Sequence, residues 1–212
     1  MEGDALIPVF CFASSVPLSQ GRRRRTEKDG QAVEPGYLVP DVLAPNLTLV
    51  FCGTAPSAAS AAAKAYYAKP GNKFWPTLFQ VGITPRQFSA HEYPELRSLA
   101  IGLTDLCKIH CGVDADLPDD AFDLSAFRQK ITKYRPALVA FTSKHAAQSA
   151  LGYAVDYGIQ EEVWGATRFF VLTSPSGLAT RYFRLDIWQA LADQYRAPSA
   201  TTASRRNTIG RR

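Results

Sequence analysis

Residues 47–75 read LTLVFCGTAPSAASAAAKAYYAKPGNKFW, and this segment decides the fold that the sequence predicts. It begins with mostly apolar and β-branched residues, which are typical of a strand that is buried on both faces. Gly53 and Pro56 then predict a tight turn, and Ser57 is a suitable N-cap for a helix over the alanine-rich residues 58–65. A strand, a short loop and a helix N-terminus in this order indicate a concave place lined with backbone N–H groups, where small polar or anionic ligands bind.

The end of the same segment adds aromatic side chains to this predicted loop. Two tyrosines precede Lys69 and Asn72, and Phe74 and Trp75 follow them. Aromatic faces beside a cation and an amide favour a flat heteroaromatic ligand.

The composition predicts one domain with basic extensions. The chain has 212 residues, of which 46% are hydrophobic, so it is long enough to bury a single core. We expect the domain to span residues 36–196. Residues 1–35 and 197–212 are expected to be flexible and basic, because they contain charged stretches with little apolar surface to bury. The formal net charge of +5 favours an acidic partner such as nucleic acid, and Arg22 to Arg25 fit either non-specific phosphate binding or a solvated linker.

The cysteines and the hydropathy pattern argue against several classes of protein. Four cysteines occur without a C-x-x-C pair, so neither a zinc ribbon nor a four-cysteine iron–sulfur cluster is expected. Cys107, His110 and Cys111 are close in sequence, but without a second pair of ligands they are interpreted as ordinary residues. No run approaches the ~18 apolar residues that span a membrane, and Glu2 and Asp4 do not fit a signal peptide. We therefore expect no metal site, no membrane partner and a cytoplasmic location, in the bacterial cytosol or nucleoid if the chain is prokaryotic.

Strand and helix patterns alternate along the rest of the domain. Further strands are predicted at residues 98–106, 137–141 and 169–172, and further helices at 73–81, 124–134, 143–150 and 182–195. This alternation predicts parallel β-α-β units, and hence a three-layer α/β/α sandwich with a central, mainly parallel sheet of four or five strands. In such sheets the ligand site lies beyond the carboxyl ends of the strands. The loops 53–57, 142–144 and 174–178, together with Asp105, are therefore expected to meet there.

Three short motifs in this order resemble the uracil-DNA glycosylase superfamily. They are Gly53-Thr-Ala-Pro-Ser57, Tyr67-Ala-Lys-Pro-Gly-Asn-Lys-Phe-Trp75 and Ser174-Pro-Ser-Gly-Leu178, called here the first, second and third motifs. They look most similar to the mismatch-specific uracil/thymine branch, which has a G-x-N-P-G loop, a segment close to H-P-x-N-R-F-W and an N-P-S-G-L loop. The resemblance covers about residues 45–195. It implies a monomeric, monofunctional enzyme that hydrolyses the N-glycosidic bond of uracil, or of another deaminated base, in DNA and leaves an abasic site, the first step of base excision repair. It also implies that no metal or organic cofactor is needed.

The chain departs from this branch at two positions. Ala55 stands where the branch has an asparagine that positions the attacking water, and Ser174 stands where the third motif begins with asparagine. The sequence therefore resembles subgroups with an altered first motif, including hypoxanthine-excising relatives and enzymes that use an aspartate elsewhere. Two alternatives stay open, a uracil-DNA binding protein of the same fold without turnover and an unrelated α/β nucleotide-binding domain. The absence of a P-loop or G-x-G-x-x-G motif disfavours the second.

The chemistry implied by the resemblance points to Asp105 and Asn72 as the candidate catalytic residues. Expelling an anionic base leaves positive charge on the sugar, so a nearby carboxylate and donors to the base both help. The apolar neighbours of Asp105 would hold it in a place with little solvent, although an aspartate that caps a turn is the alternative. The amide of Asn72 can read a base edge, or the residue forms a turn.

Two further sets of candidates follow from the resemblance. Tyr67 is at the position where the flipped base stacks, with a core tyrosine as the alternative, and Phe74 fits either this set or the hydrophobic core. Leu178 fits an apolar wedge that fills the gap left by the flipped base, or else a core contact. The substrate-binding candidates are Gly53, Thr54, Ala55, Ser57, Tyr67, Phe74 and Ser174, and the DNA-binding candidates are Lys144, Ser176, Gly177, Leu178 and Arg181.

Overall fold

The computed structural model describes residues 36–196. The expected flexible extensions, 1–35 with its arginine run and 197–212, lie outside the described residues. The elements are β1 (Leu49–Gly53), α1 (Ala58–Ala63), α2 (Phe74–Gln80), the 3-10 helix η1 (Ala90–Leu99), β2 (Ile101–Asp105), the 3-10 helix η2 (Asp114–Asp116), α3 (Leu124–Tyr134), β3 (Leu138–Phe141), α4 (Lys144–Leu151), β4 (Gly158–Trp164), β5 (Thr167–Val171), the 3-10 helix η3 (Gly177–Tyr182) and α5 (Leu185–Arg196).

Five strands form one sheet in the order β2-β1-β3-β5-β4. The pairs β1–β2, β1–β3 and β3–β5 are parallel, and only β4 runs antiparallel to its neighbour β5. The predicted α/β fold with a mainly parallel sheet is therefore confirmed. Strand β4 was not predicted from the sequence. Its large apolar side chains Ile159 and Val163 are about half exposed, and polar residues separate them, so the strand has no apolar run.

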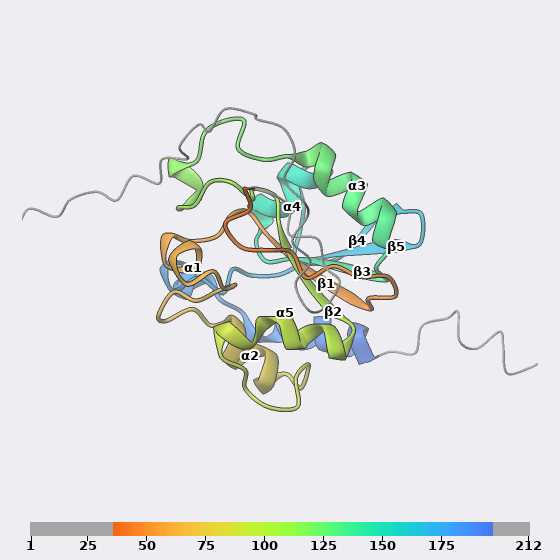
Figure 1. The fold of residues 1–212 in the computed structure, drawn as a ribbon. Coiled ribbons are helices and arrows are strands. Elements are labelled where there is room, and N and C mark those ends of the chain that lie inside the picture. The colour runs from red at the N-terminus through yellow and green to blue at the C-terminus, as the bar shows by residue number, and fades with distance from the viewer. Residues whose placement is uncertain (1–35, 197–212) are drawn as a thin grey trace, which may run out of the picture.

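Helices cover both faces of the sheet, as Figure 1 shows with α3 and α4 on one side and α2 and α5 on the other. The alternation of side chains along β1 explains this arrangement. Leu49 and Phe51 pack with the core that includes α2, η1 and α5, whereas Val50 and Cys52 pack with α3 and α4. None of the helices between residues 36 and 196 has the length and apolarity that crossing a membrane requires.

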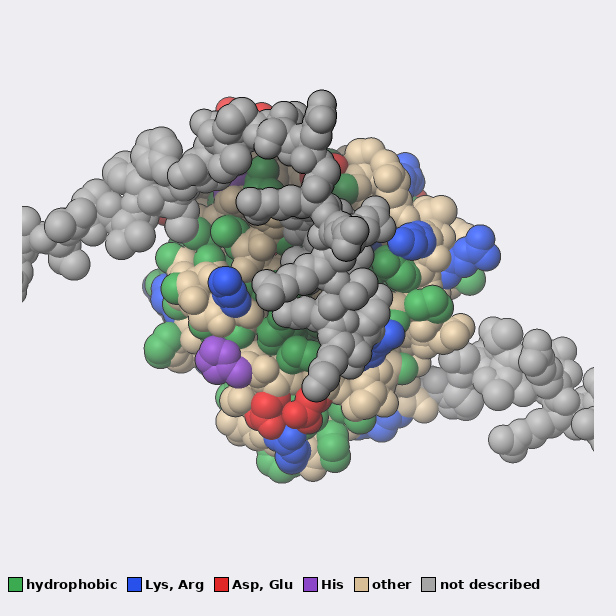
Figure 2. Space-filling model, in the orientation of Figure 1, with side chains coloured by type: hydrophobic (Ala, Val, Ile, Leu, Met, Phe, Trp, Pro, Cys, Tyr) green, Lys and Arg blue, Asp and Glu red, His purple; other side chains and the backbone are tan. Residues whose placement is uncertain are grey.

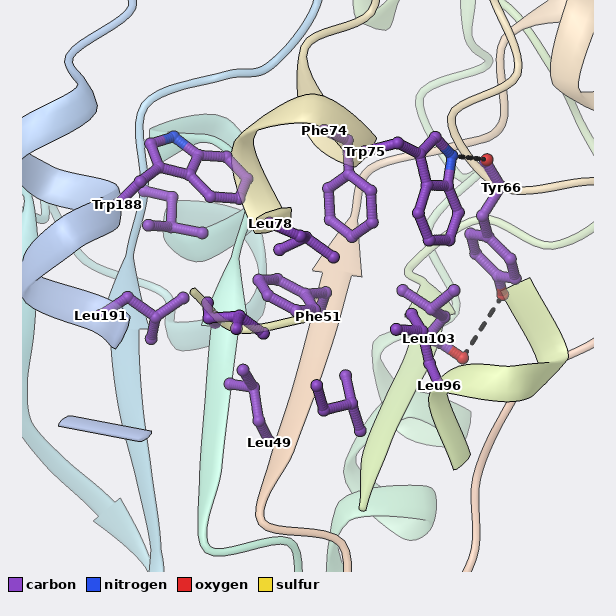
Figure 3. Packing of buried hydrophobic residues seen from close by; sticks show 14 of the residues in the cluster. Leu49, Phe51, Tyr66, Phe74, Trp75, Leu78, Leu96, Leu103, Trp188 and Leu191 are labelled. Atoms are coloured by element: carbon purple, nitrogen blue, oxygen red, sulfur yellow. Dashed lines mark hydrogen bonds between the residues drawn. The ribbon is translucent and has the colours of Figure 1, made fainter. Parts of the chain in front are cut away.

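An aromatic core ties the second motif to the sheet. Phe51 contacts both Phe74, at a centroid distance of 5.0 Å, and Trp188, at 6.1 Å (Figure 3). The indole Nε1 of Trp75 donates to the backbone carbonyl of Tyr66 at 3.0 Å. The second motif is thus anchored through β1 and α5, so its polar residues are held rigidly next to the strand ends.

Serine caps start two of the predicted helices. The hydroxyl of Ser57 accepts a hydrogen bond from the N–H of Ser60, and α1 ends at Ala63, followed by the C-cap Lys64, whose φ of 49° is left-handed. The hydroxyl of Ser143 accepts from the N–H of Ala146 at 3.0 Å, which confirms the predicted start of α4. Both caps place loop backbone at the carboxyl end of the strand that precedes them.

Candidate functional site

A cleft of about 430 Å³ lies at the carboxyl ends of the four parallel strands. This volume falls in the range of small-molecule sites. The expected convergence of the strand-end loops is therefore present. The candidates that line the cleft are Gly53, Thr54, Ala55, Ser57, Tyr67, Asn72, Asp105, Ser174, Ser176 and Leu178. Their roles in binding or catalysis stay predictions.

Asp105 is the last residue of β2 and is opposite Gly53 in the sheet register. Its side chain is 4% exposed, and its Oδ2 atom has no hydrogen-bond partner among the described residues. A Cβ atom on Gly53 would lie 2.5 Å from Asp105 Oδ1, so only glycine lets the carboxylate come this close to the first motif. A buried, incompletely bonded carboxylate that lines a cleft is a strong candidate for chemistry.

Burial raises the pKa of Asp105 to about 6. Lys108 is the largest opposing influence, because its positive charge favours the ionised carboxylate, whereas the negative charge of Asp41 raises the pKa further. Lys130 and the backbone N–H of Gly53 also favour the ionised form. The carboxylate is therefore ionised at neutral pH but gains a proton in mildly acidic solution.

Tyr67 presents an aromatic wall to the cleft. Its ring stacks on Phe74 at a centroid distance of 3.8 Å, and its hydroxyl donates to Thr142 Oγ1 at 3.3 Å. Phe74 itself is fully buried and does not line the cleft, which favours the core alternative for this residue. Thr142 follows the last residue of β3 and lines the cleft, and the sequence predicted it only as part of a loop. Its hydrogen bond to Tyr67 connects the end of β3 to the aromatic wall.

Asn72 uses one side of its amide to shape its own loop. Its Oδ1 atom accepts a hydrogen bond from the N–H of Phe74 at 2.9 Å, and its own N–H donates to the carbonyl of Lys69 at 3.0 Å. The turn-forming role is therefore present. The side-chain NH₂ group makes none of these bonds and can donate to a ligand in the cleft.

The second and third motifs are in direct contact. The N–H of Lys73 donates to the carbonyl of Pro175 at 2.8 Å, and a Cβ atom on Gly177 would lie 3.2 Å from the carbonyl oxygen of Gly71. Gly177 therefore serves the close approach of two loops and does not line the cleft. The hydroxyl of Ser176 accepts from the N–H of Leu178 at 3.3 Å and caps η3.

Leu178 stands at the mouth of the cleft with 71% of its surface exposed. The core alternative for this residue is wrong, because so exposed a side chain packs against little protein. Tyr182, at the end of the same 3-10 helix, is equally exposed and also lines the cleft. Arg181 and Lys144 lie outside the lining, and Lys144 Nζ is 3.1 Å from Asp156 Oδ1 in an ion pair.

A contact that the sequence analysis missed involves Asp114, in η2. Its Oδ1 atom accepts a hydrogen bond from the hydroxyl of Thr54 at 2.6 Å, and its Oδ2 atom lies 2.7 Å from Nδ1 of His145. The N–H of Gly112 also donates to the carbonyl of Pro56. The loop after β2 is thus held against the first motif. No local pattern reveals this, because the partners are 60 and 31 residues apart.

Surface charge does not by itself locate a nucleic-acid interface. On the face shown in Figure 2, the described Lys and Arg side chains are scattered and do not form one stripe. Within residues 36–196, no group of three or more His, Cys, Asp or Glu side chains is placed to hold a metal ion. The sulfur of Cys107 accepts a hydrogen bond from the N–H of His110 at 3.4 Å within one turn.

Comparison with known proteins assigns this chain to a family. The family model of the uracil DNA glycosylase superfamily matches residues 40–192. A solution NMR structure of a Methanosarcina acetivorans protein, provisionally assigned as a uracil DNA glycosylase, is similar with a TM-score of 0.52. The two sequences are 24% identical, and the match covers 74% of this chain and 96% of the other. At this identity the likeness supports the fold.

Proposed function

Because this chain belongs to the uracil DNA glycosylase superfamily, we propose that it hydrolyses the N-glycosidic bond of uracil in DNA and leaves an abasic site. The observation that carries the proposal is the position of Asp105, a buried carboxylate with an unbonded oxygen at the edge of the cleft. Ala55 has no side-chain group that can activate water, so another residue has to supply this chemistry.

Asp105 suits the charge that develops during base release. As the bond breaks, the base gains negative charge and the sugar gains positive charge. A carboxylate in a site with little solvent stabilises a neighbouring cation more strongly than one in water. The same carboxylate can accept a proton from the attacking water as a general base. We propose that Asp105 does both, and that water acts as the nucleophile.

Tyr67 and Asn72 suit recognition of the base. The face of Tyr67 offers a stacking surface, which is worth roughly 1–3 kcal/mol per base. The NH₂ group of Asn72 can donate to a carbonyl oxygen, whereas its Oδ1 atom already accepts from the N–H of Phe74 and is the weaker partner for an exocyclic amine. Cytosine and adenine carry an amine where uracil and hypoxanthine carry a carbonyl. We therefore propose that deaminated bases are preferred, with uracil as the first substrate and hypoxanthine as the second.

Leu178 suits the extrusion of the nucleotide. An enzyme that acts on a base in a duplex has to flip it out of the stack and fill the gap. Leu178 is large, apolar and exposed beside the cleft, so it can enter the stack as a wedge. The hydroxyl of Ser176 and the side chain of Arg181 are proposed to contact the neighbouring phosphates.

The test uses one labelled DNA strand with a single uracil, alone and opposite guanine or adenine. The protein is added in a metal chelator, and the products are separated with and without alkali treatment. We expect cleavage that depends on both uracil and alkali, because alkali cuts at abasic sites. Strand cleavage without alkali would contradict the monofunctional mechanism. Retention of uracil-containing DNA in a gel shift with an intact base would instead support the non-catalytic binding protein, which Ala55 and Ser174 suggest as the second candidate.

A further inference from the structure

A second group of charged side chains lies beside Asp105 and outside the cleft lining. The Nζ atom of Lys108 is 2.8 Å from Asp41 Oδ1, and the Nζ atom of Lys130 is 2.7 Å from Asp41 Oδ2. These side chains are only 5%, 11% and 15% exposed for Lys108, Asp41 and Lys130. We call these three residues the buried lysine cluster. It joins the segment before β1, the residues after β2 and helix α3.

The composition of the buried lysine cluster is unusual for a purely structural ion pair. Burying charge is costly, and one lysine is sufficient to neutralise Asp41. The second lysine leaves one surplus positive charge in a place with little solvent. The charged side chains that act most strongly on Asp105 are those of this cluster. Two lysines and two aspartates balance to zero only when Asp105 is ionised, so the cluster and the carboxylate form one charge-balanced group.

Hydrogen bonds hold the two residues that flank Asp105, one to the buried lysine cluster and one to the first motif. The hydroxyl of Thr104 donates to Asp41 Oδ1 at 2.9 Å. The N–H of Leu106 donates to the carbonyl of Gly53 at 3.0 Å. Asp105 stands between these two residues in the sequence. Asp105 is therefore flanked by a side-chain bond to the cluster on one side and by a backbone bond to the first motif on the other.

Aromatic rings enclose the lysines of the cluster. Lys108 Nζ lies 5.2 Å from the ring centre of Tyr37 and 5.1 Å from that of Tyr66, and it donates to the Tyr66 hydroxyl at 2.7 Å. Lys130 Nζ lies 4.7 Å from the ring centre of Tyr37. Figure 3 shows how Tyr66 is itself held by Trp75 and by the carbonyl of Leu103. Aromatic faces attract ammonium groups and exclude water, so these charges are fixed in position.

Resting on the proposed glycosylase function, we propose that the buried lysine cluster is a positioning assembly that keeps the Asp105 carboxylate ionised and directed towards the reacting sugar. Burial pushes the pKa of Asp105 upward, and the two lysines oppose this effect. Burial raises the pKa of three further groups, Cys52, Tyr66 and Tyr67, and the negative charge of Asp105 also raises it. These groups therefore stay neutral and leave the lysines as the balancing charge.

The test changes Lys130 and measures the titration of Asp105 directly. In Lys130→Met, Asp41 keeps Lys108 as its partner, so the variant removes only the surplus charge. The full chain is labelled with ¹³C at the aspartate carboxyls, and the Asp105 signal is assigned from its loss in Asp105→Asn. Lys130→Arg keeps the charge. Lys133→Met is the matched control, because Lys133 is on the same helix but contacts the ring of Tyr134.

We expect the titration midpoint of Asp105 to rise by about half a pH unit or more in Lys130→Met, and the acid limb of the uracil-release rate to move with it. Lys130→Arg and Lys133→Met should both titrate like the wild type. An unchanged midpoint in Lys130→Met would overturn the inference. This holds even if the variant melts at a lower temperature, because a loss of stability without a change in titration is what a purely structural ion pair would show. The titration of the Asp105 carboxyl signal can be measured even if the protein has no enzymatic activity. A wild type that releases no base would therefore refute the proposed function while the carboxyl signal still decides this inference.

Discussion

Gly53 and Asp105 face each other across the β1–β2 pair, and Asp105 Oδ1 lies 2.5 Å from where a Cβ atom on Gly53 would be. No side chain fits in that space without moving the carboxylate. The position of Asp105, which comes more than fifty residues later in the chain, therefore explains why the first motif begins with glycine. The two features belong to one site.

Gly53→Ala should reduce base release by tenfold or more, because the added methyl group displaces Asp105 and a small misplacement of a catalytic group costs on the order of 10²-fold. Single-turnover kinetics on uracil-containing DNA measure the effect. Asp123→Ala is the control, since it removes the N-cap of α3 and costs about 0.5–2 kcal/mol of stability away from the cleft. Equal losses of rate in the two variants would mean that destabilisation, and not the Asp105 position, explains the result.

Asp105→Asn should abolish most of the activity and yet stabilise the fold in alkaline solution. The pKa of this carboxyl is about 6 in the folded protein and near 3.8 when unfolded. Between these values the folded state holds a proton that the unfolded state releases, so the stability of the wild type falls as the pH rises through this window. The loss is complete about one pH unit above the folded pKa and amounts to roughly 3 kcal/mol.

Chemical denaturation at several pH values checks this prediction. The difference in unfolding free energy between Asp105→Asn and the wild type should grow in favour of the variant from about pH 4 to about pH 7 and then stay constant. A difference that does not change with pH would show that the carboxyl titrates normally in the folded protein.

Tyr67→Ala should weaken substrate binding about 5- to 150-fold, which corresponds to the roughly 1–3 kcal/mol of base stacking. Tyr67→Phe keeps the ring and loses only the hydrogen bond to Thr142, so it should bind uracil-containing DNA almost as well as the wild type. Titration of DNA in single-turnover assays gives the half-saturating concentration for each variant. If the two variants lose the same affinity, the hydroxyl and not the aromatic face is what the substrate needs.

Leu178→Ala should slow base release from a duplex more than from a single strand, because only the duplex leaves a gap for the wedge to fill. The thermal stability should not change, since the side chain is 71% exposed. Val163→Ala, an exposed position on β4, is the matched control and should leave both rates unchanged. Equal slowing on single and double strands would contradict the wedge.

Local sequence signals predicted much of the fold and the cleft, whereas long-range contacts were not visible in them. The β1 strand, the Ser143 cap and the loops at the strand ends follow from patterns within a few residues. Strand β4 has Ile159 and Val163 on its exposed face, so the alternation of its side chains carries no burial signal.

The contacts around Asp105 could not be predicted because they join distant parts of the chain. Thr54 meets Asp114 across 60 residues. Asp41 lies before β1, yet it is paired with lysines that follow β2 and belong to α3. A basic residue and an acidic residue at such separations look like ordinary surface charge in a sequence. Only the sheet order brings them together behind the cleft.

The most direct test of the central claim is the rate of uracil release under single-turnover conditions, measured for the wild type and Asp105→Asn from about pH 4.5 to about pH 8.5. If the Asp105 carboxylate is the catalytic group, the wild-type rate rises tenfold per pH unit at low pH and levels off with a midpoint near the pKa of about 6. Asp105→Asn should be slow at every pH and show no such limb. A variant that releases uracil as fast as the wild type, with the same dependence on pH, would contradict the assignment of Asp105.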